Sequence, residues 1–290
     1  MRNAFIDELV SLAEKFDHIA LMVGDLGWSV VEPFAERFPD RFINAGIAEQ
    51  NMAGMAAGMA SEGYHVFTYS IANFPTFRCA EQIRNDVDYH NLPVTTVSVG
   101  GGLAYGSLGY SHHAVQDYAL MRTMPNMLIA APGDPLEVRA CLRYLVNHPQ
   151  PSYLRIGKAG EPTFHGTVPD IQPGRWLKVR DGKAPNSAAI VSTGAALGMA
   201  MDHCVDHAVF SLPLWGMKAK PAQSQQVNAF DTIITFEDHL VDGGFGSWLM
   251  EAVRDQRELT SRIEIKALGP EVCGAVASQQ TLHRLGGLAP

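Results

Sequence analysis

The residues with the clearest chemical potential lie in the segment FINAGIAEQNMAGMAAG (42–58), where a strand end and a glycine lead into a helix that opens with Glu49. A lone glutamate in a first helical turn compensates the exposed N–H groups there. Here the helix is mostly apolar, Phe74 and Phe77 follow it, and a glycine-rich stretch, GGGLAYGSLGYSHH, comes next. Such surroundings desolvate a carboxyl group, which raises its pKa and lets it share a proton with a bound nitrogen base. We therefore interpret Glu49 as a candidate acid–base group.

Three other positions suggest substrate contacts. His112 and His113 end the glycine-rich stretch without a third ligand at metal spacing, so we expect no metal site and assign one of them to proton transfer or to hydrogen bonding with a substrate. Arg155 closes the apolar run PSYLRIG, and a position beyond a strand end favours an anion clamp. The glycines fit neither GxGxxG nor the P-loop pattern, and no G-x-S-x-G elbow supports a hydrolase.

Composition restricts the class of protein. The 290 residues carry 22 Lys and Arg against 30 Asp and Glu, a net charge of −8, which disfavours binding to nucleic acid or to an anionic membrane. The four cysteines lie far apart with no CxxC pair, which is typical of a reducing compartment. The N-terminus lacks the apolar run of a signal peptide, and we find no apolar stretch long enough to span a bilayer. We expect a soluble, cytoplasmic protein.

The elements that position these residues follow from hydrophobic periodicity. Strand-type runs alternate with helical stretches over the first half of the chain, which predicts a mainly parallel sheet covered on both faces. The Met- and Ala-rich helix over 49–60 is expected to be buried on most of its surface, and Gly54 and Gly58 would permit close helix packing, within its own domain or at an interface. We expect strands at 18–23, 66–71, 93–100, 126–132 and 151–157, and helices at 4–15, 76–89, 115–123 and 134–147.

Prolines and glycines concentrate over 160–187 and mark a domain boundary. We place the domains at 1–165 and 166–290. Strand-type runs at 188–194, 207–214, 231–238 and 263–269, with helical stretches at 194–206 and 246–256, predict that the second domain is also α/β. The fold class is therefore two α/β domains.

The order of motifs resembles the pyrimidine-binding domain of transketolases. The motifs are VGDLGWS, RFINAGIAEQNMAGMAAGMA, YSIANFPTFRCAEQIRNDVDY, the glycine-rich stretch running on to PGD, and YLRIGKAGEP. The later FEDHLVDGGFGSWLMEAV and ALGPEVCG are similar to the C-terminal domain of that family. The likeness covers nearly the whole chain, yet the GDG…N motif of the diphosphate-binding domain is missing. The resemblance thus implies the C-terminal subunit of a split transketolase.

This resemblance implies a cofactor and a partner. The cofactor is thiamine diphosphate, with Mg²⁺ or Ca²⁺ held by an N-terminal subunit that carries the diphosphate-binding domain, in an α₂β₂ assembly. Glu49 corresponds to the glutamate that bonds the aminopyrimidine ring nitrogen, so that the exocyclic nitrogen can remove the thiazolium C2 proton. Phe74 and Phe77 correspond to aromatics that pack on the pyrimidine. Ile71 replaces a further aromatic and offers no π face.

Substrate contacts are also implied. His112 matches the substrate-facing histidine, and Arg2, Ser29 and Arg155 match residues that contact a substrate phosphate. The resemblance predicts a transferase of the EC 2.2.1 type in carbohydrate metabolism, which moves a two-carbon ketol unit from a ketose to an aldose. The substrates would be sugars or sugar phosphates.

The sequence departs from the family pattern at two positions, and alternative functions have to be weighed. An aspartate that reads an acceptor hydroxyl falls at Leu108, and a phosphate-contacting histidine falls at Gly100, so we do not expect the standard pentose phosphate pair to be the natural substrates. Alternative activities are deoxyxylulose phosphate synthesis or that of a 2-oxo acid dehydrogenase β subunit. A non-catalytic interaction subunit is disfavoured, because a scaffold has no need of a buried acid beside aromatic platforms.

Overall fold

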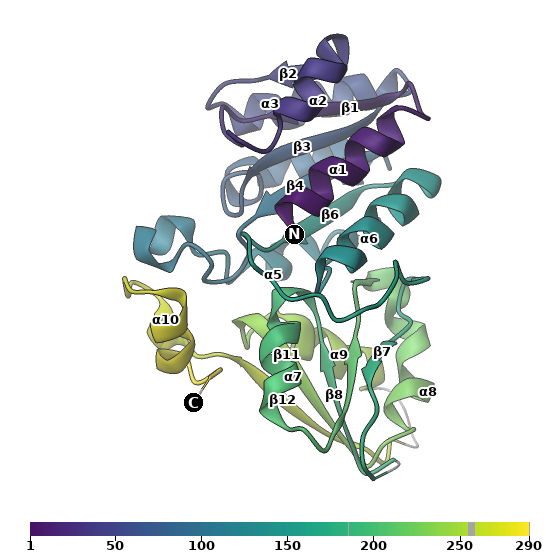
Figure 1. Cartoon of the computed structure of the whole chain (residues 1–290), viewed down its shortest axis with the longest axis vertical. Coiled ribbons are helices and arrows are strands. Elements are labelled where there is room, and N and C mark those ends of the chain that lie inside the picture. Colours follow the sequence, from purple (N-terminus) through teal and green to yellow (C-terminus); the bar gives the residue numbers. More distant parts are fainter. Residues whose placement is uncertain (185, 255–258, 290) are drawn as a thin grey trace.

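Two β-sheets form the framework of the molecule. A computed structural model describes residues 1–184, 186–254 and 259–289. The first sheet has seven strands in the order β10-β5-β6-β4-β3-β1-β2, and the second has five in the order β12-β11-β8-β9-β7 (Figure 1). Neighbouring strands run parallel except β10 against β5 and β7 against β9. The predicted fold class, two mainly parallel α/β units, is confirmed.

Most expected elements are present with modest shifts of their ends, but the helix expected over 76–89 consists of a 3-10 turn (Phe77–Cys79), a short α-helix and a π-helical turn (Ile83–Asp88). The first sheet consists of β1 (Ile19–Val23), β2 (Phe42–Asn44), β3 (His65–Ile71), β4 (Val94–Val99), β5 (Leu128–Ala130), β6 (Ser152–Ile156) and β10 (Leu214–Gly216). Its helices are α1 (Arg2–Ala13), α2 (Glu32–Arg37), α3 (Glu49–Ser61), α4 (Ala80–Gln82), α5 (Asp117–Met121) and α6 (Pro135–Asn147). The second unit consists of β7 (Leu177–Arg180), β8 (Ala188–Ser192), β9 (Ala208–Ser211), β11 (Thr232–Leu240), β12 (Arg262–Leu268), α7 (Leu197–His203), α8 (Gln223–Val227), α9 (Phe245–Val253) and α10 (Gln279–Leu285). Residues 255–256 of the helix expected over 246–256 lie outside the described part.

Side chains that alternate along the strands of the first sheet pack into separate hydrophobic clusters on its two faces. Leu21 of β1 packs in one hydrophobic cluster with residues of α1 and α6, such as Leu9 and Leu142. Its neighbour Met22 points to the opposite face and packs with Met52 of α3. This is the period of two expected for a strand whose two faces are both covered. Each of these fully buried side chains contributes about 1.5–3 kcal/mol to folding.

Helix α3 departs from the sequence-based expectation. Its inner face is buried, as Met52 and Ala56 show, but Met55 on the outer face is 38% exposed. An added Cβ at Gly54 or Gly58 would find nothing within 4 Å. The prediction that this helix is buried on most of its surface is therefore wrong for the single chain, because the helix covers the sheet with one side only. Within the described residues the two glycines mediate no close helix packing.

The run expected as one strand over 207–214 is divided between the two sheets. Its first part is β9, in the second sheet, whereas β10 crosses to the first sheet and pairs antiparallel with β5. Pro213 stands at the break, where it has no N–H to donate, and its carbonyl accepts a 2.7 Å hydrogen bond from Ala131 N. The first sheet thus takes its edge strand from the second half of the chain. The boundary between 165 and 166 stays a prediction.

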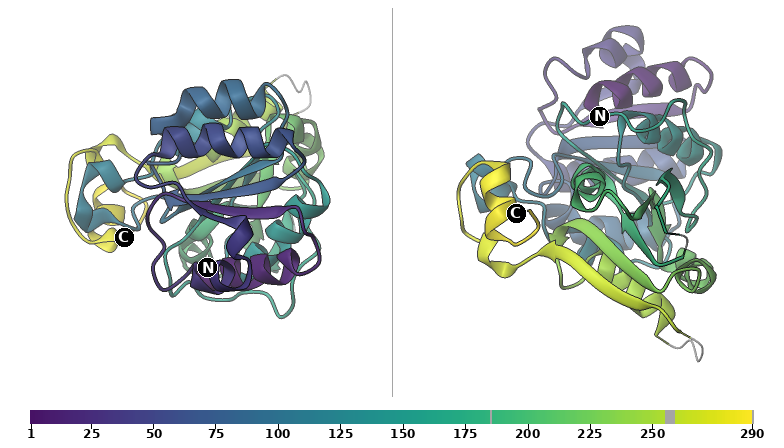
Figure 2. Two further views of the ribbon diagram at one scale, coloured as in Figure 1. Left: turned by 90° about the horizontal axis from the view of Figure 1, so that it is seen from above. Right: turned by 60° about the horizontal axis from the view of Figure 1, so that its bottom comes forward.

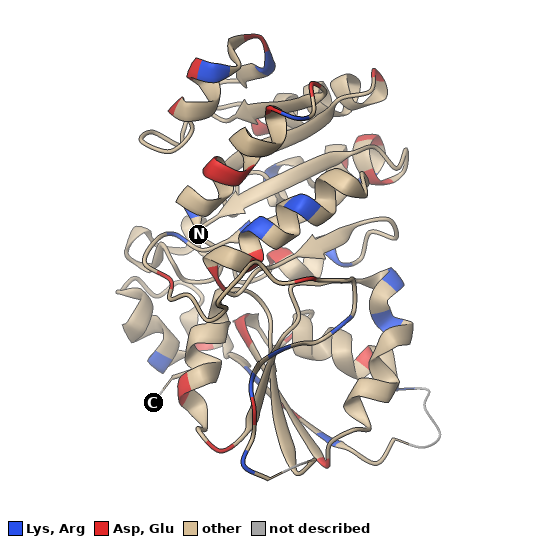
Figure 3. Cartoon of the chain, turned by 45° about the vertical axis from the view of Figure 1, so that its right-hand side comes forward, with Lys and Arg blue, Asp and Glu red and all other residues tan. Residues whose placement is uncertain are grey.

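Charged residues are distributed over both units, as Figure 3 shows. No helix in the described part combines the length and apolar character needed to cross a bilayer. Among the same residues, no group of three or more His, Cys, Asp and Glu side chains is arranged to hold a metal ion.

Candidate active site

The carboxylate of Glu49 is buried at the start of α3. Its side chain is 1% exposed, in agreement with the expected burial. Ser70, near the end of β3, donates a 3.2 Å hydrogen bond to Oε1, and Arg78 donates a 2.6 Å hydrogen bond to Oε2. The parallel order of the strands brings the ends of β2 and β3 to the same edge of the sheet, which is where α/β proteins bind ligands.

Arg78 was not anticipated from the sequence. Its side chain is 43% exposed while the carboxylate it binds is buried, so the guanidinium closes the solvent side of Glu49. The same guanidinium lies 4.5 Å from the centre of the Phe74 ring, a cation–π arrangement. The available signal was a cation placed four residues after Phe74, in the segment IANFPTFRCA, which has no other charged residue.

His112 faces Phe74, the ring that Arg78 also contacts. The rings of His112 and Phe74 meet edge to face at 5.2 Å, and Ser111 Oγ lies 3.0 Å from His112 Nδ1. Partial burial, and then the neighbouring His113, lower the pKa of His112 below its usual value. His113 is instead fully buried, with Nε2 3.1 Å from the carbonyl oxygen of Gly106. Of the two histidines, His112 is the one directed to the site.

A basic group lies next to His112. The Tyr105 ring is 6.4 Å from His112, and Lys158 Nζ is 5.1 Å from the centre of the Tyr105 ring. Arg2 Nε donates a 2.6 Å hydrogen bond to the carbonyl oxygen of Lys158. Two cations, Arg2 from the N-terminus and Lys158 from the segment after β6, therefore lie near Tyr105, whose ring is 6.4 Å from that of His112. Arg2 was expected here and Lys158 was not.

Three further predicted site residues are Ile71, Phe77 and Ser29. Ile71, which ends β3, is half-buried, and its carbonyl oxygen accepts a 2.8 Å hydrogen bond from Phe74 N. Phe77 is 48% exposed and lines a groove of about 600 Å³ with Tyr110. Ser29 is exposed in the loop after β1, where its backbone has φ of 64°. Contacts of Ile71, Phe77 and Ser29 with a cofactor or substrate stay predictions.

Arg155 differs from its predicted placement. It lies inside β6, and its side chain is 3% exposed. Its Nε donates a 2.7 Å hydrogen bond to Asp117, and its other nitrogens bond Tyr118 Oη and the carbonyl oxygens of Ala114 and Asp238. The expectation that it stands beyond a strand end is wrong, because the strand continues through it into the junction between the two sheets. In this structure the guanidinium is enclosed by protein acceptors.

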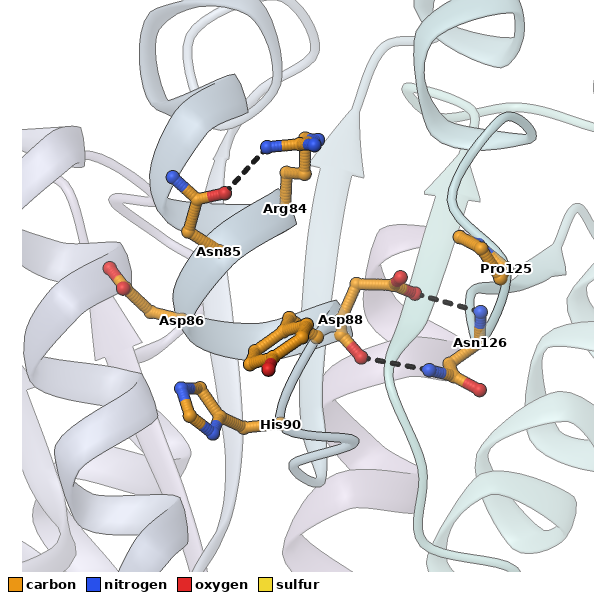
Figure 4. Close-up of a pocket in the computed structure, with 8 residues that line it drawn as sticks. Arg84, Asn85, Asp86, Asp88, His90, Pro125 and Asn126 are labelled. Atoms are coloured by element: carbon orange, nitrogen blue, oxygen red, sulfur yellow. Dashed lines mark hydrogen bonds between the residues drawn. The ribbon is translucent and has the colours of Figure 1, made fainter.

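A separate cavity of about 660 Å³ lies away from these residues, beside the π-helical turn Ile83–Asp88 (Figure 4). There Asp88 Oδ1 accepts a 3.0 Å hydrogen bond from Asn126 N, and Asn126 Nδ2 donates to the Asp88 carbonyl oxygen. Glu49, Phe74 and His112 do not line it. Cavity size alone therefore does not identify the candidate site.

The class of protein follows from the fold and from this line of residues. A buried acid at a helix start, an aromatic ring and a histidine lie at one edge of a parallel sheet, which agrees with the pyrimidine-binding domain that the sequence resembles. In agreement, the family model described as the transketolase pyrimidine-binding domain matches residues 1–160. The chain belongs to the transketolase family.

Relatives cover most of the chain. It is 31% identical over 260 residues to a putative transketolase C-terminal section of Methanocaldococcus jannaschii, which spans 87% of this chain and 81% of the relative. It is 32% identical over 270 residues to one of the subunits of an apulose-4-phosphate transketolase of Phocaeicola vulgatus, spanning 88% and 83%. A solved structure titled split gene transketolase, inactive beta4 tetramer, superposes with a TM-score of 0.81 at 28% identity and covers 99% of this chain and 93% of that one. The resemblance to split transketolases is confirmed.

Proposed function

We propose that this chain is the pyrimidine-binding subunit of a thiamine diphosphate-dependent transketolase and that it transfers a two-carbon ketol unit from a ketose to an aldose. The observation that carries the proposal is the line from Glu49 through Arg78 and Phe74 to His112, at distances of 2.6, 4.5 and 5.2 Å. Such a reaction needs one group of residues that binds the cofactor and another that binds the sugar. Along this edge of the sheet, the buried acid and the aromatic ring would bind the cofactor, and the histidine would bind the sugar.

The residues present fit an aminopyrimidine. The cofactor, when bound, supplies the carbon nucleophile and the electron sink that amino acid side chains lack. Glu49 would hold the proton of the pyrimidine ring nitrogen, since its carboxylate is buried and only the half-exposed Arg78 covers its solvent side. Phe74 would pack against the ring. Ser70 keeps the carboxylate oriented through its hydrogen bond to Oε1.

The substrate end is polar and cationic. His112 would hydrogen-bond the sugar, and its lowered pKa favours a neutral ring that can accept or donate. Arg2 and Lys158 would bind a phosphate group, the role that the sequence predicts for Arg2, Ser29 and Arg155. A phosphorylated substrate is supported by the relative named for apulose 4-phosphate. The enclosed Arg155 supports the site from behind.

A second subunit completes the proposal. Among the described residues none form a metal-binding group, so Mg²⁺ or Ca²⁺ and the diphosphate would be held by an N-terminal subunit, with α₂β₂ stoichiometry. The outer face of α3, with Gly58 and the 38% exposed Met55, and the neighbouring Ile47, 78% exposed, offer an apolar surface for this contact. The related structure is titled an inactive tetramer of the β chain, which agrees with a need for another subunit.

Calorimetry and product analysis test the proposal. The purified chain alone should bind thiamine diphosphate and Mg²⁺ weakly or not at all, whereas the complex with a GDG-containing subunit should bind both. The complex should form a ketose from hydroxypyruvate and an aldose. Turnover of pyruvate in place of hydroxypyruvate would support the deoxyxylulose phosphate synthase or oxo acid dehydrogenase alternative. Tight cofactor binding by the isolated chain would contradict a split site.

A further inference from the structure

The loop that carries His112, residues 100–113, touches the second half of the chain at three of its glycines, Gly102, Gly106 and Gly109. An added Cβ at Gly102 would lie 1.9 Å from Asp238 Oδ2, and one at Gly106 would lie 2.6 Å from Leu282 Cδ1. Gly102 also has φ of 65°, which favours glycine. The His112 loop and α10 lie side by side in Figure 1 and in both views of Figure 2. These glycines therefore permit close approach of the C-terminal half.

Asp238 makes the central contact. It lies in β11 between Phe236 and Leu240, where the register with β12 shifts, and is 3% exposed. Its Oδ2 accepts a 3.2 Å hydrogen bond from Leu103 N, 135 residues away in the chain. His283 Nε2 of α10 lies 3.1 Å from Asp238 Oδ1, an ion-pair distance when the imidazole is protonated. Burial disfavours charge on both groups. Even so, His283 and Arg155 hold the pKa of Asp238 below its usual value, and Asp238 raises the pKa of His283.

Apolar packing reinforces this contact. Leu103 is fully buried and belongs to the same hydrophobic cluster as Phe236 and Leu282 of the second half. On the other side, the loop is closed by the bridge between Gly102 and Ala114. The loop is therefore fixed at its base and back, while His112 at its far end faces Phe74.

We infer that Asp238 and His283 are positioning residues that hold the His112 loop in place, so that the C-terminal half of the chain sets the orientation of the substrate-facing histidine. This inference rests on the proposed function for its kinetic consequence, but not for its structural one. Neither residue reaches the line from Glu49 to His112, so they act through the loop. The carboxylate anchors the Leu103 amide, and His283 lies against the other oxygen of that carboxylate.

Hydrogen exchange on the isolated full chain tests the structural part. In Asp238→Ala and in the milder His283→Gln, amides over 103–113 should exchange about tenfold faster or more, because a buried anchor is lost, while amides of β3 and β4 stay protected. Asp242→Asn, a change of an exposed acid in the same segment, is the control. Asp238→Asn, which keeps an acceptor for Leu103 N, should fall between. Unchanged exchange of the loop in the two Asp238 variants and in His283→Gln would overturn the inference.

A double-mutant cycle on the assembled complex tests the kinetic part. Asp238→Ala should lower kcat/KM by about 10- to 100-fold, the scale of a misplaced binding group. In a His112→Ala background the same change should cost less than about twofold, because both act through one group. Full additivity would overturn the positioning role. If loop exchange is faster in the variants but the wild-type complex has no transketolase activity, the proposed function is refuted and the positioning of the loop is not.

Discussion

Two arginine–carboxylate pairs of nearly equal length occupy different environments in this protein. Arg78 and Glu49 meet at 2.6 Å at the site edge, and Arg155 and Asp117 meet at 2.7 Å at the junction of the two sheets. The Arg78 side chain is 43% exposed, whereas that of Arg155 is 3% exposed. Solvent reaches the guanidinium of Arg78, whereas that of Arg155 is surrounded by protein acceptors. Burial of the cation, and not the pair distance, separates a group available for binding from one that holds the fold.

The largest expected effect is on the buried pair. Arg155→Met should lower the free energy of unfolding by about 3–5 kcal/mol, because Asp117 is left buried without its counter-charge. Arg78→Met should lower the free energy of unfolding by clearly less, since solvent reaches the carboxylate of Glu49 once the guanidinium is removed. Chemical denaturation of the two variants measures the difference. Adding Asp117→Leu to Arg155→Met should recover part of the loss, and the reverse order of the two arginines would contradict the comparison.

The next largest effect concerns the other carboxylate. Glu49→Gln in the assembled complex should lower kcat by about 100-fold or more, since the amide keeps the shape but cannot share a proton with the ring nitrogen. Its thermal midpoint and assembly should match wild type, in contrast with Arg155→Met. Steady-state kinetics and light scattering measure both properties. Turnover near that of the wild type would remove Glu49 from its assigned role.

A smaller effect is expected on the open face of α3. Gly58→Leu should weaken association with the partner subunit by about tenfold, equal to roughly 1.4 kcal/mol, because the added side chain holds the partner away. Gly198→Leu in α7 is a matched control, since a Cβ there also finds nothing within 4 Å. Light scattering of the co-purified chains should give an α₂β₂ mass for wild type. Equal affinity of the two variants would place the interface elsewhere.

The smallest effect is a pH dependence near the link between the two halves. A hydrogen bond to Glu137 at 2.9 Å raises the pKa of His165 above its usual value, against the effect of burial. The contribution of the His165–Glu137 hydrogen bond to the free energy of unfolding is therefore fully present below about pH 6.5, the usual pKa of histidine. It is lost as pH rises through the raised pKa of His165. The difference in unfolding free energy between wild type and His165→Gln should shrink as pH rises above about 6.5 and through the raised pKa of His165. A difference that grows with pH would reverse the assignment.

Much of the fold was predictable because each element is specified by neighbouring residues. Periodicity located α1, α6 and the strands β3 and β4. It failed over 207–214, where both halves of the run are apolar and only the competition between two sheets decides that β10 leaves the second. It also overestimated the burial of α3, since composition does not state which faces have partners.

The sequence by itself determined that Glu49 opens an apolar helix and that Phe74 and His112 follow in a transketolase-like order. The tertiary structure alone decided that Arg78 covers Glu49, that Lys158 joins Arg2, and that Arg155 is enclosed. The reason is physical. Residue type and local spacing fix which groups can react, but burial and pairing depend on segments far apart in the chain, such as Leu103 and Asp238, which are 135 residues apart.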